Sequence, residues 1–216
     1  HRAHASTYGM VRHFEHKAKV KAGGLLIRAE LEQLGALLAR PERPFIAVMG
    51  GAKVSDKLEV LNSLIDRVQG ILVGGAMAYT FLKAQGYGVG SSMVEMDLLD
   101  EANIILQKAS NRHVAIHLPV DHVVVSNFND ESGEVTDGVN IPDGTLGLDI
   151  GPKTRTAYAN VLDGAATVFW NGPMGVFERK AFAEGTFAVA RAIAGSNARS
   201  VVGGGDSASA VRAAGL

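Results

Sequence analysis

Two kinds of hydrophobic pattern alternate along the chain. Short, nearly continuous apolar runs predict buried strands at 45–49, 71–73, 114–118, 148–150, 166–170 and 200–202. Between them, apolar residues recur at helical spacing, which predicts helices at 24–39, 55–67, 77–84, 96–109, 154–161, 181–194 and from about Asp206. Apolar strands that alternate with helices form parallel sheets covered on both faces. The pattern therefore predicts an α/β fold with a doubly wound, mostly parallel sheet, Rossmann-like, in three α/β/α layers.

One segment interrupts this rhythm. Residues 126–146 are rich in turn formers, among them Asp130, Gly133, Gly138 and Pro142. We interpret the segment as a small β-hairpin excursion whose acidic residues form a solvated face.

Glycine follows most of the predicted strands. The positions are Gly50-Gly51, Gly74-Gly75, Gly151, Gly172 and 203–205. In open parallel sheets, ligands bind beyond the carboxyl ends of the strands, and glycine there allows a backbone to approach a phosphate or purine. These glycines favour a nucleotide site at one sheet edge, although tight strand-to-helix turns also use glycine. The dinucleotide-binding, P-loop and nucleophile-elbow motifs are absent, which disfavours a dehydrogenase, a P-loop NTPase and an α/β hydrolase.

Lys53 and Lys57 are four residues apart at the predicted start of a helix. On that spacing their ammonium groups share one side of the helix near the positive end of its dipole, which is unfavourable for two cations. A phosphate would accept both charges and the helix N–H groups. Two solvated lysines, one of them paired with Asp56 or Glu59, are the alternative.

Two further segments carry candidate ligand groups. The glycines at 203–205 open a helix whose free N–H groups could hold phosphoryl oxygens. Asp206 either caps that helix or supports Mg²⁺, which takes few protein carboxylates and relies on substrate phosphates. Residues 170–178 form an apolar turn that ends in an acid. This loop could wall a purine and let Glu178 accept from ribose hydroxyls; a packed loop with a surface acid is the alternative.

Composition narrows the classes of protein. Of the 216 residues, 47% are hydrophobic and 20% are charged, which is ordinary for a globular protein and too apolar for disorder. A net charge of −1 gives no global field that attracts nucleic acid or an anionic membrane, so any anion site must be local. Cysteine is absent, which excludes disulfides and thiolate zinc sites, and the apolar runs are too short to span a bilayer. We expect a cytoplasmic monomer that binds neither nucleic acid nor membrane.

Six segments stand out together, in chain order 1–6 (HRAHAS), 50–57 (GGAKVSDK), 74–82 (GGAMAYTFL), 118–121 (LPVD), 170–178 (WNGPMGVFE) and 203–206 (GGGD). In this order they resemble phosphoglycerate kinase. The resemblance covers essentially the whole chain. It implies reversible phosphoryl transfer between 1,3-bisphosphoglycerate and ADP, which gives 3-phosphoglycerate and Mg-ATP in glycolysis.

The resemblance also implies roles for individual residues. Lys53 would follow the transferring phosphoryl group, and Lys57 would hold nucleotide phosphate. Gly203, Gly204 and Gly205 would present N–H groups to the moving phosphoryl. Asp206 would support Mg²⁺, with Ser207 beside it. The purine side would be lined by Gly51, Gly74, Gly75, Gly147, Leu148 and Val176, Glu178 would bind ribose, and Arg2 would help bind the phosphoglycerate.

The same resemblance implies a domain organisation. Residues 1–22 would be a remnant of the N-terminal substrate domain, 23–40 the interdomain connector helix, and 41–216 the C-terminal nucleotide-binding domain, incomplete at its end. Most of the family's N-terminal domain and its closing Ser/Thr-Gly-Gly-Gly segment are not in this sequence. We therefore expect the chain by itself to bind Mg-nucleotide without turnover.

Two other classes stay open. One is a non-catalytic nucleotide-binding module. The other is an interaction protein that uses the basic residues of 1–21 and binds metal through His1, His4, His13 and His16. The spacing of these histidines fits no standard metal site.

Overall fold

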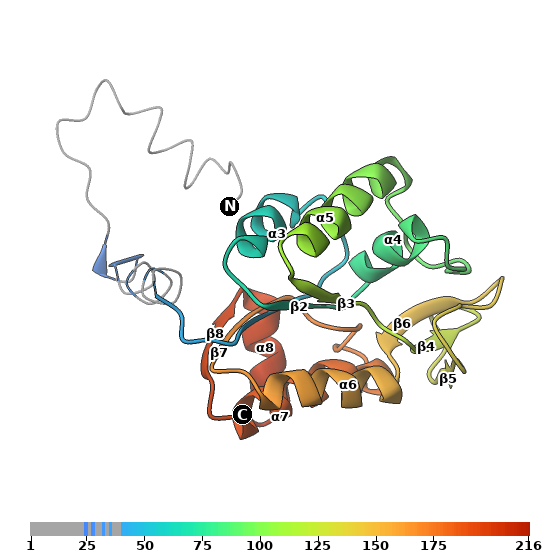
Figure 1. Cartoon of the computed structure of the whole chain (residues 1–216). Coiled ribbons are helices and arrows are strands. Elements are labelled where there is room, and N and C mark those ends of the chain that lie inside the picture. The colour runs from blue at the N-terminus through green and yellow to red at the C-terminus, as the bar shows by residue number, and fades with distance from the viewer. Residues whose placement is uncertain (1–23, 26, 29–31, 33–34, 36–39) are drawn as a thin grey trace, which may run out of the picture.

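The computed structural model describes residues 24, 25, 27, 28, 32, 35 and 40–216 (Figure 1). Of the helix predicted at 24–39, the described residues Leu25, Ile27, Arg28, Glu32 and Gly35 are helical. The rest of that helix lies outside the described residues, as do residues 1–23 with Arg2 and the histidines considered as metal ligands.

The main sheet has five parallel strands in the order β3-β2-β1-β7-β8 (Figure 1). They are β1 (Phe45–Met49), β2 (Gly70–Val73), β3 (Ala115–His117), β7 (Thr167–Asn171) and β8 (Arg199–Gly203). Every residue of β1 is buried, as a central strand covered on both faces requires. The predicted doubly wound, parallel fold is confirmed, and the predicted bounds of these strands are right to about one residue.

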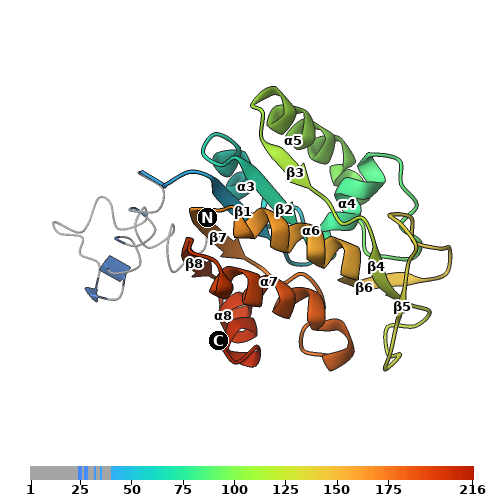
Figure 2. The same cartoon turned by 60° about the horizontal axis from the view of Figure 1, so that its bottom comes forward.

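Helices cover both faces of this sheet. One face carries α3 (Leu58–Ile65), α4 (Met77–Ala84) and α5 (Leu99–Asn111), and the other carries α6 (Pro152–Asp163), α7 (Glu184–Gly195) and α8 (Gly205–Ala213) (Figures 1 and 2). Short 3₁₀ turns, η2 (Met96–Leu98) and η3 (Lys180–Phe182), precede α5 and α7. In the described part of the chain, none of the helices has the length and apolar composition that a membrane span needs.

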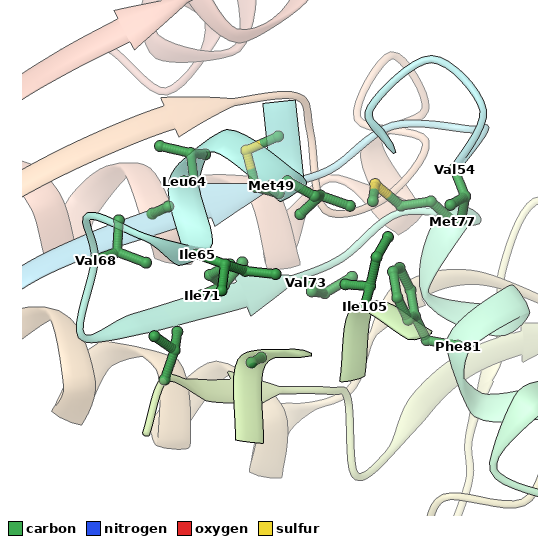
Figure 3. Packing of buried hydrophobic residues seen from close by; sticks show 14 of the residues in the cluster. Met49, Val54, Leu64, Ile65, Val68, Ile71, Val73, Met77, Phe81 and Ile105 are labelled. Carbon is green, nitrogen blue, oxygen red and sulfur yellow. The ribbon is translucent and has the colours of Figure 1, made fainter. Parts of the chain in front are cut away.

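Alternate residues of β1 enter two different cores. Phe45, Ala47 and Met49 pack with α3, α4 and α5, and Figure 3 shows side chains from these elements meeting in this cluster. Ile46 and Val48 point the opposite way and join Trp170 and residues of α6, α7 and α8. Because successive strand residues face opposite sides of a sheet, one apolar strand supplies both cores.

A second, smaller sheet lies beside α4 and α6 (Figures 1 and 2). Its antiparallel strands, in the order β5-β4-β6, are β4 (His122–Val125), β5 (Glu134–Val135) and β6 (Leu146–Ile150). The predicted β excursion is confirmed, but it is larger than the range 126–146. The strand predicted at 148–150 belongs to it and not to the parallel sheet.

The prediction that Gly151, which follows β6, lies with the other glycines at one edge of the main sheet is therefore wrong. Gly151 does not lie at the carboxyl edge of the main sheet, because β6 pairs antiparallel with β4. Its N–H donates to the Asp121 backbone oxygen at 2.9 Å, and a Cβ atom on Gly151 would come 2.3 Å from Asp121 Cγ. This glycine is required by close packing against Asp121.

Candidate functional site

Three glycine-containing loops meet at the carboxyl edge of the main sheet. The Gly50 N–H donates to Asn171 O at 3.0 Å, and the Gly51 N–H donates to Pro173 O at 3.1 Å. The Gly75 N–H donates to Met174 O at 2.8 Å. The loop after β7 therefore fastens together the loops after β1 and β2.

Close packing explains several of these glycines without a ligand. A Cβ atom on Gly50 would lie 2.1 Å from Pro173 O, and one on Gly74 would lie 2.4 Å from the Met174 sulfur. Gly172 has a φ of +104°, and its Cβ atom would lie 2.1 Å from Gly50 O. A Cβ on Gly205 would meet no atom within 4 Å, so this glycine has open space in front of it. The glycine-rich edge thus combines glycines that loop packing requires with a glycine that borders open space.

The two lysines differ from their predicted arrangement. The first helix after β1 begins at Leu58, with Lys57 as its N-cap residue and Lys53 in the loop before it. The prediction that both lysines share one side of a helix is therefore wrong, because the segment 51–57 is a loop. Lys53 is exposed, and its ammonium group has no hydrogen bond or ion pair with any described residue.

Lys57 is joined to the end of β8 through one side chain. Its ammonium group donates to the amide oxygen of Asn171, whose amide nitrogen donates to Gly203 O at 2.7 Å. The sequence pattern places Asn171 only within the loop 170–178 and assigns it no role of its own. A polar residue directly after a buried strand, at the ligand-binding edge, was the available signal.

A carboxylate holds the lysine loop from the other side. Both the N–H and the hydroxyl of Ser55 donate to Glu95, at 3.1 and 2.6 Å. The Glu95 N–H in turn donates to the Thr80 hydroxyl of α4 at 3.1 Å. Glu95 was also missed, because a contact across 40 residues leaves no local pattern in the sequence.

The N-terminus of α8 follows β8 directly. Its N-cap residue is Gly204, without a side-chain cap hydrogen bond, so the interpretation of Asp206 as the cap is wrong. Asp206 is exposed in the first turn of the helix. Ser207 is buried, and its hydroxyl oxygen accepts the Gly172 N–H at 2.7 Å. The serine therefore ties the start of α8 to the loop after β7.

The residues predicted to line a purine also adjoin this loop. The Val176 N–H donates to Leu148 O at 2.9 Å. Gly147 packs against α4, where a Cβ atom on it would lie 2.0 Å from the Tyr79 hydroxyl. Glu178 is exposed at the end of the same loop. Gly147, Leu148 and Val176 are thus brought together, although they come from segments about 30 residues apart.

Asp149 is a buried acid behind this loop that sequence analysis did not identify. It is 1% exposed; its Oδ1 accepts the Ile150 N–H at 2.9 Å and its Oδ2 accepts the Gly185 N–H of α7 at 2.7 Å. A Cβ atom on Gly175 would come 2.3 Å from Oδ1, so the loop packs on the carboxyl group. Burial raises the pKa of Asp149 to about 7, although the two backbone donors and Arg155 lower it.

We expect Asp149→Asn to remove a pH dependence of stability. The unfolded chain releases the Asp149 proton near the ordinary pKa of 3.8, whereas the folded protein keeps it up to about 7. Because the folded state binds more protons in this interval, the free energy of unfolding falls as pH rises from about 4 to about 7. Urea denaturation should show the variant gaining stability relative to the parent chain as pH rises from about 4 to about 7.

The change of stability with pH, and not the stability at any one pH, tests the raised pKa of the Asp149 carboxyl group. The amide nitrogen of the variant faces one of the two backbone N–H groups, which lowers stability at every pH. A difference between variant and parent that stays constant with pH would contradict the raised pKa.

The fold and the groups at the carboxyl edge of the main sheet define the class of protein. It is a doubly wound α/β domain whose strand ends carry packed glycine turns, two lysines and a helix N-terminus. The family model described as phosphoglycerate kinase matches residues 1–216. The chain belongs to the phosphoglycerate kinase family.

Individual relatives agree with this assignment. A phosphoglycerate kinase of Clostridium botulinum (strain Eklund 17B / Type B) is 54% identical over 216 residues, which are 100% of this chain and 54% of that protein. One of Anaeromyxobacter sp. (strain Fw109-5) is 57% identical over 219 residues, with 100% and 54% covered. The structure of phosphoglycerate kinase from Coxiella burnetii is similar with a TM-score of 0.84 and 42% identity, over 89% of this chain and 50% of that one. The chain thus spans about half the length of the relatives it matches.

Proposed function

We propose that this chain is the nucleotide-binding part of a phosphoglycerate kinase. The reaction is reversible phosphoryl transfer between 1,3-bisphosphoglycerate and ADP, which gives 3-phosphoglycerate and ATP in glycolysis. The observation that carries the proposal is the hydrogen-bonded series from Lys57 through Asn171 to Gly203, in a chain of this family. It sets an ammonium group beside the open N-terminus of α8, an arrangement that suits phosphate.

At the phosphate end of the site, charged side chains and backbone N–H groups would both bind the phosphates. Phosphoryl transfer needs positioning and charge neutralisation more than covalent chemistry. Lys57 would hold a nucleotide phosphate, and the exposed Lys53 would follow the transferring group. The N–H groups at 203–205 would receive phosphoryl oxygens. Gly205 supports this role, since no atom lies within 4 Å of the position its Cβ would take.

Asp206 would hold Mg²⁺ together with the nucleotide. Its carboxylate is exposed and has no hydrogen bond or ion pair with any described residue. Among those residues no group of three or more His, Cys, Asp or Glu side chains could hold a metal ion alone. A single carboxylate fits Mg²⁺, which relies on substrate phosphates for further ligands. The bound ion supplies positive charge that neutralises the phosphate oxygens.

The base and ribose would lie along the loop after β7. Gly147, Leu148 and Val176 would form a mostly apolar wall for a purine, with Gly51, Gly74 and Gly75 on the side of the β1 and β2 loops. Glu178 would accept hydrogen bonds from ribose hydroxyls. Ser207 would act indirectly, by holding the start of α8 against Gly172.

The remaining assignments follow from family membership. Residues 1–22 would belong to the substrate domain with Arg2 in its basic patch, 23–40 to the connector, and 41–216 to the nucleotide domain. We propose a cytoplasmic monomer, and a chain that alone binds Mg-nucleotide without turnover. A coupled assay tests the last point, because family-like turnover by the chain alone would overturn it. A non-catalytic nucleotide module remains the second candidate.

Calorimetric titration of the chain with Mg-ADP tests the nucleotide site. We expect Lys57→Ala to weaken binding roughly 10- to 100-fold, because a hydrogen bond to a charged group contributes about 1.5–3 kcal/mol. Glu178→Ala should weaken binding roughly 3- to 10-fold, since Glu178 would contact neutral hydroxyls at the surface. Lys83→Ala, which removes an exposed lysine near the end of α4, is the matched control and should bind like the parent. Unchanged affinity in both Lys57→Ala and Glu178→Ala would sink the assignment.

A further inference from the structure

Arg179 joins the loop after β7 to the small sheet. Its guanidinium group donates to two backbone oxygens, those of Phe128 and Asp130, in the connection between β4 and β5. The same group lies over two rings, 5.5 Å from the Phe128 centroid and 4.8 Å from the Phe182 centroid. A planar guanidinium can make two directed hydrogen bonds and stack on rings at once, which lysine cannot reproduce. The contacts define a clamp between residues 128–130 and Arg179.

Glu178, the residue before Arg179, has no comparable support. Its carboxylate is exposed and makes no hydrogen bond or ion pair with any other described residue. Its position is therefore set by the backbone on either side. Upstream, Val176 is held through its N–H to Leu148 O at 2.9 Å. Downstream, the clamp at Arg179 is the neighbouring fixed point.

The clamp rests on the apolar cluster beneath the proposed purine wall. Phe182 is fully buried and packs with Val125 and Leu148, and Val176 lies against the same cluster. Arg179 covers the Phe182 ring, so its guanidinium borders the cluster that supports Leu148 and Val176. A shift of Arg179 would move the backbone on which Glu178 sits.

We infer that Arg179 is a positioning residue for ribose recognition, which holds Glu178 where it meets the sugar of a nucleoside diphosphate. Arg179 itself touches no nucleotide and acts by tying the loop to residues 128–130. This inference rests on the proposed function, because it requires that the chain bind nucleotide with Glu178 on the ribose. It adds the small sheet to the nucleotide site as the support of the ribose acid.

A double-mutant cycle separates positioning from general damage to the fold. Mg-ADP and Mg-2′,3′-dideoxy-ADP, which lacks both ribose hydroxyls, are titrated into the parent chain, Arg179→Ala, Glu178→Ala and the double variant. We expect Arg179→Ala to weaken ADP binding roughly 3- to 10-fold, the value of a weakened hydrogen-bond contact, and to change dideoxy-ADP binding less than about twofold. In the Glu178→Ala background, the Arg179 substitution should have no further effect on ADP.

The outcomes distinguish this inference from the proposed function. Parent chain that binds neither nucleotide would overturn both. If the parent binds ADP but Arg179→Ala weakens the two nucleotides equally, or acts equally in both backgrounds, the clamp is merely structural and the inference fails. The matched control is Arg112→Ala, which removes an exposed arginine that pairs with Asp66 at 3.5 Å after α5. It should leave both affinities and their ratio unchanged.

Discussion

Replacing Lys53 by alanine is expected to lower the rate of phosphoryl transfer roughly 100- to 1,000-fold, the usual loss when a preorganised charge at a transition state is removed. Under the proposed function, Lys53 follows the moving phosphoryl group and neutralises charge that develops during transfer. Its exposed ammonium group makes no hydrogen bond or ion pair with any other described residue, so its truncation removes little structure. The effect should fall on kcat more than on KM for ADP, because ADP lacks the transferring group.

The measurement needs the substrate groups of a whole enzyme. The chain matches 54% of the Clostridium botulinum relative, so a hybrid can be made in which it replaces the matching segment of that protein. Coupled assays on this hybrid give kcat and KM, with Lys83→Ala as the control lysine. A Lys53→Ala hybrid with the parent kcat would show that the transferring group does not meet this lysine.

Replacing Gly172 by alanine is expected to cost about 2–6 kcal/mol of stability, the combined effect of backbone strain and overpacking. At a φ of +104° a side chain is strained, and the added Cβ would stand 2.1 Å from the backbone oxygen of Gly50. The loop after β1 cannot withdraw freely, because its N–H groups are bonded to Asn171 and Pro173. That loss is a large fraction of the about 5–15 kcal/mol that stabilises a typical domain.

Gly86→Ala is the matched control for this prediction. Gly86 has a φ of +88°, but its Cβ would meet no atom within 4 Å, so the substitution adds strain without collision. We expect it to cost about 1 kcal/mol, at the low end for a strained residue. Urea denaturation can follow both variants through Trp170, the single tryptophan of the chain. Equal losses in the two variants would refute the role of loop contact at Gly172.

The main sheet was predictable from sequence because its strands are short apolar runs buried on both faces. The small sheet was only partly predictable. Residues 122–125 begin with a buried histidine, and they follow Asp121, whose carboxylate accepts the Lys153 and Thr154 N–H groups of α6 at 2.8 Å. Because β4 begins with a polar residue, it does not show the continuous apolar run that predicts a buried strand. The N–H groups that bind the Asp121 carboxylate lie over thirty positions away in the sequence.

The candidate site was likewise only partly predictable from the sequence. Glycines and lysines at strand ends are visible as patterns, so their gathering at one edge could be predicted. Asn171, Glu95, Asp149 and Arg179 act through contacts with distant segments, which no local spacing records. The start of α3 was predicted too early in the sequence. Residues 51–57 form a loop, so the helix begins only at Leu58 and Lys53 lies outside the helix.

The pairing of β1 with β7 has a consequence for the order in which the molecule assembles during synthesis. Lys57 and Asn171 are 114 positions apart, and the loop after β7 is the piece that fastens the loops after β1 and β2. Contacts so distant in sequence form slowly, since a long loop must close before they are gained. While the ribosome makes the chain, β1 lacks its second neighbouring strand until β7 emerges, and the lysine loop after β1 lacks the loop that fastens it. The glycine-rich edge is therefore among the last parts to take shape, and before then β1 exposes an unpaired, fully apolar flank that can pair wrongly.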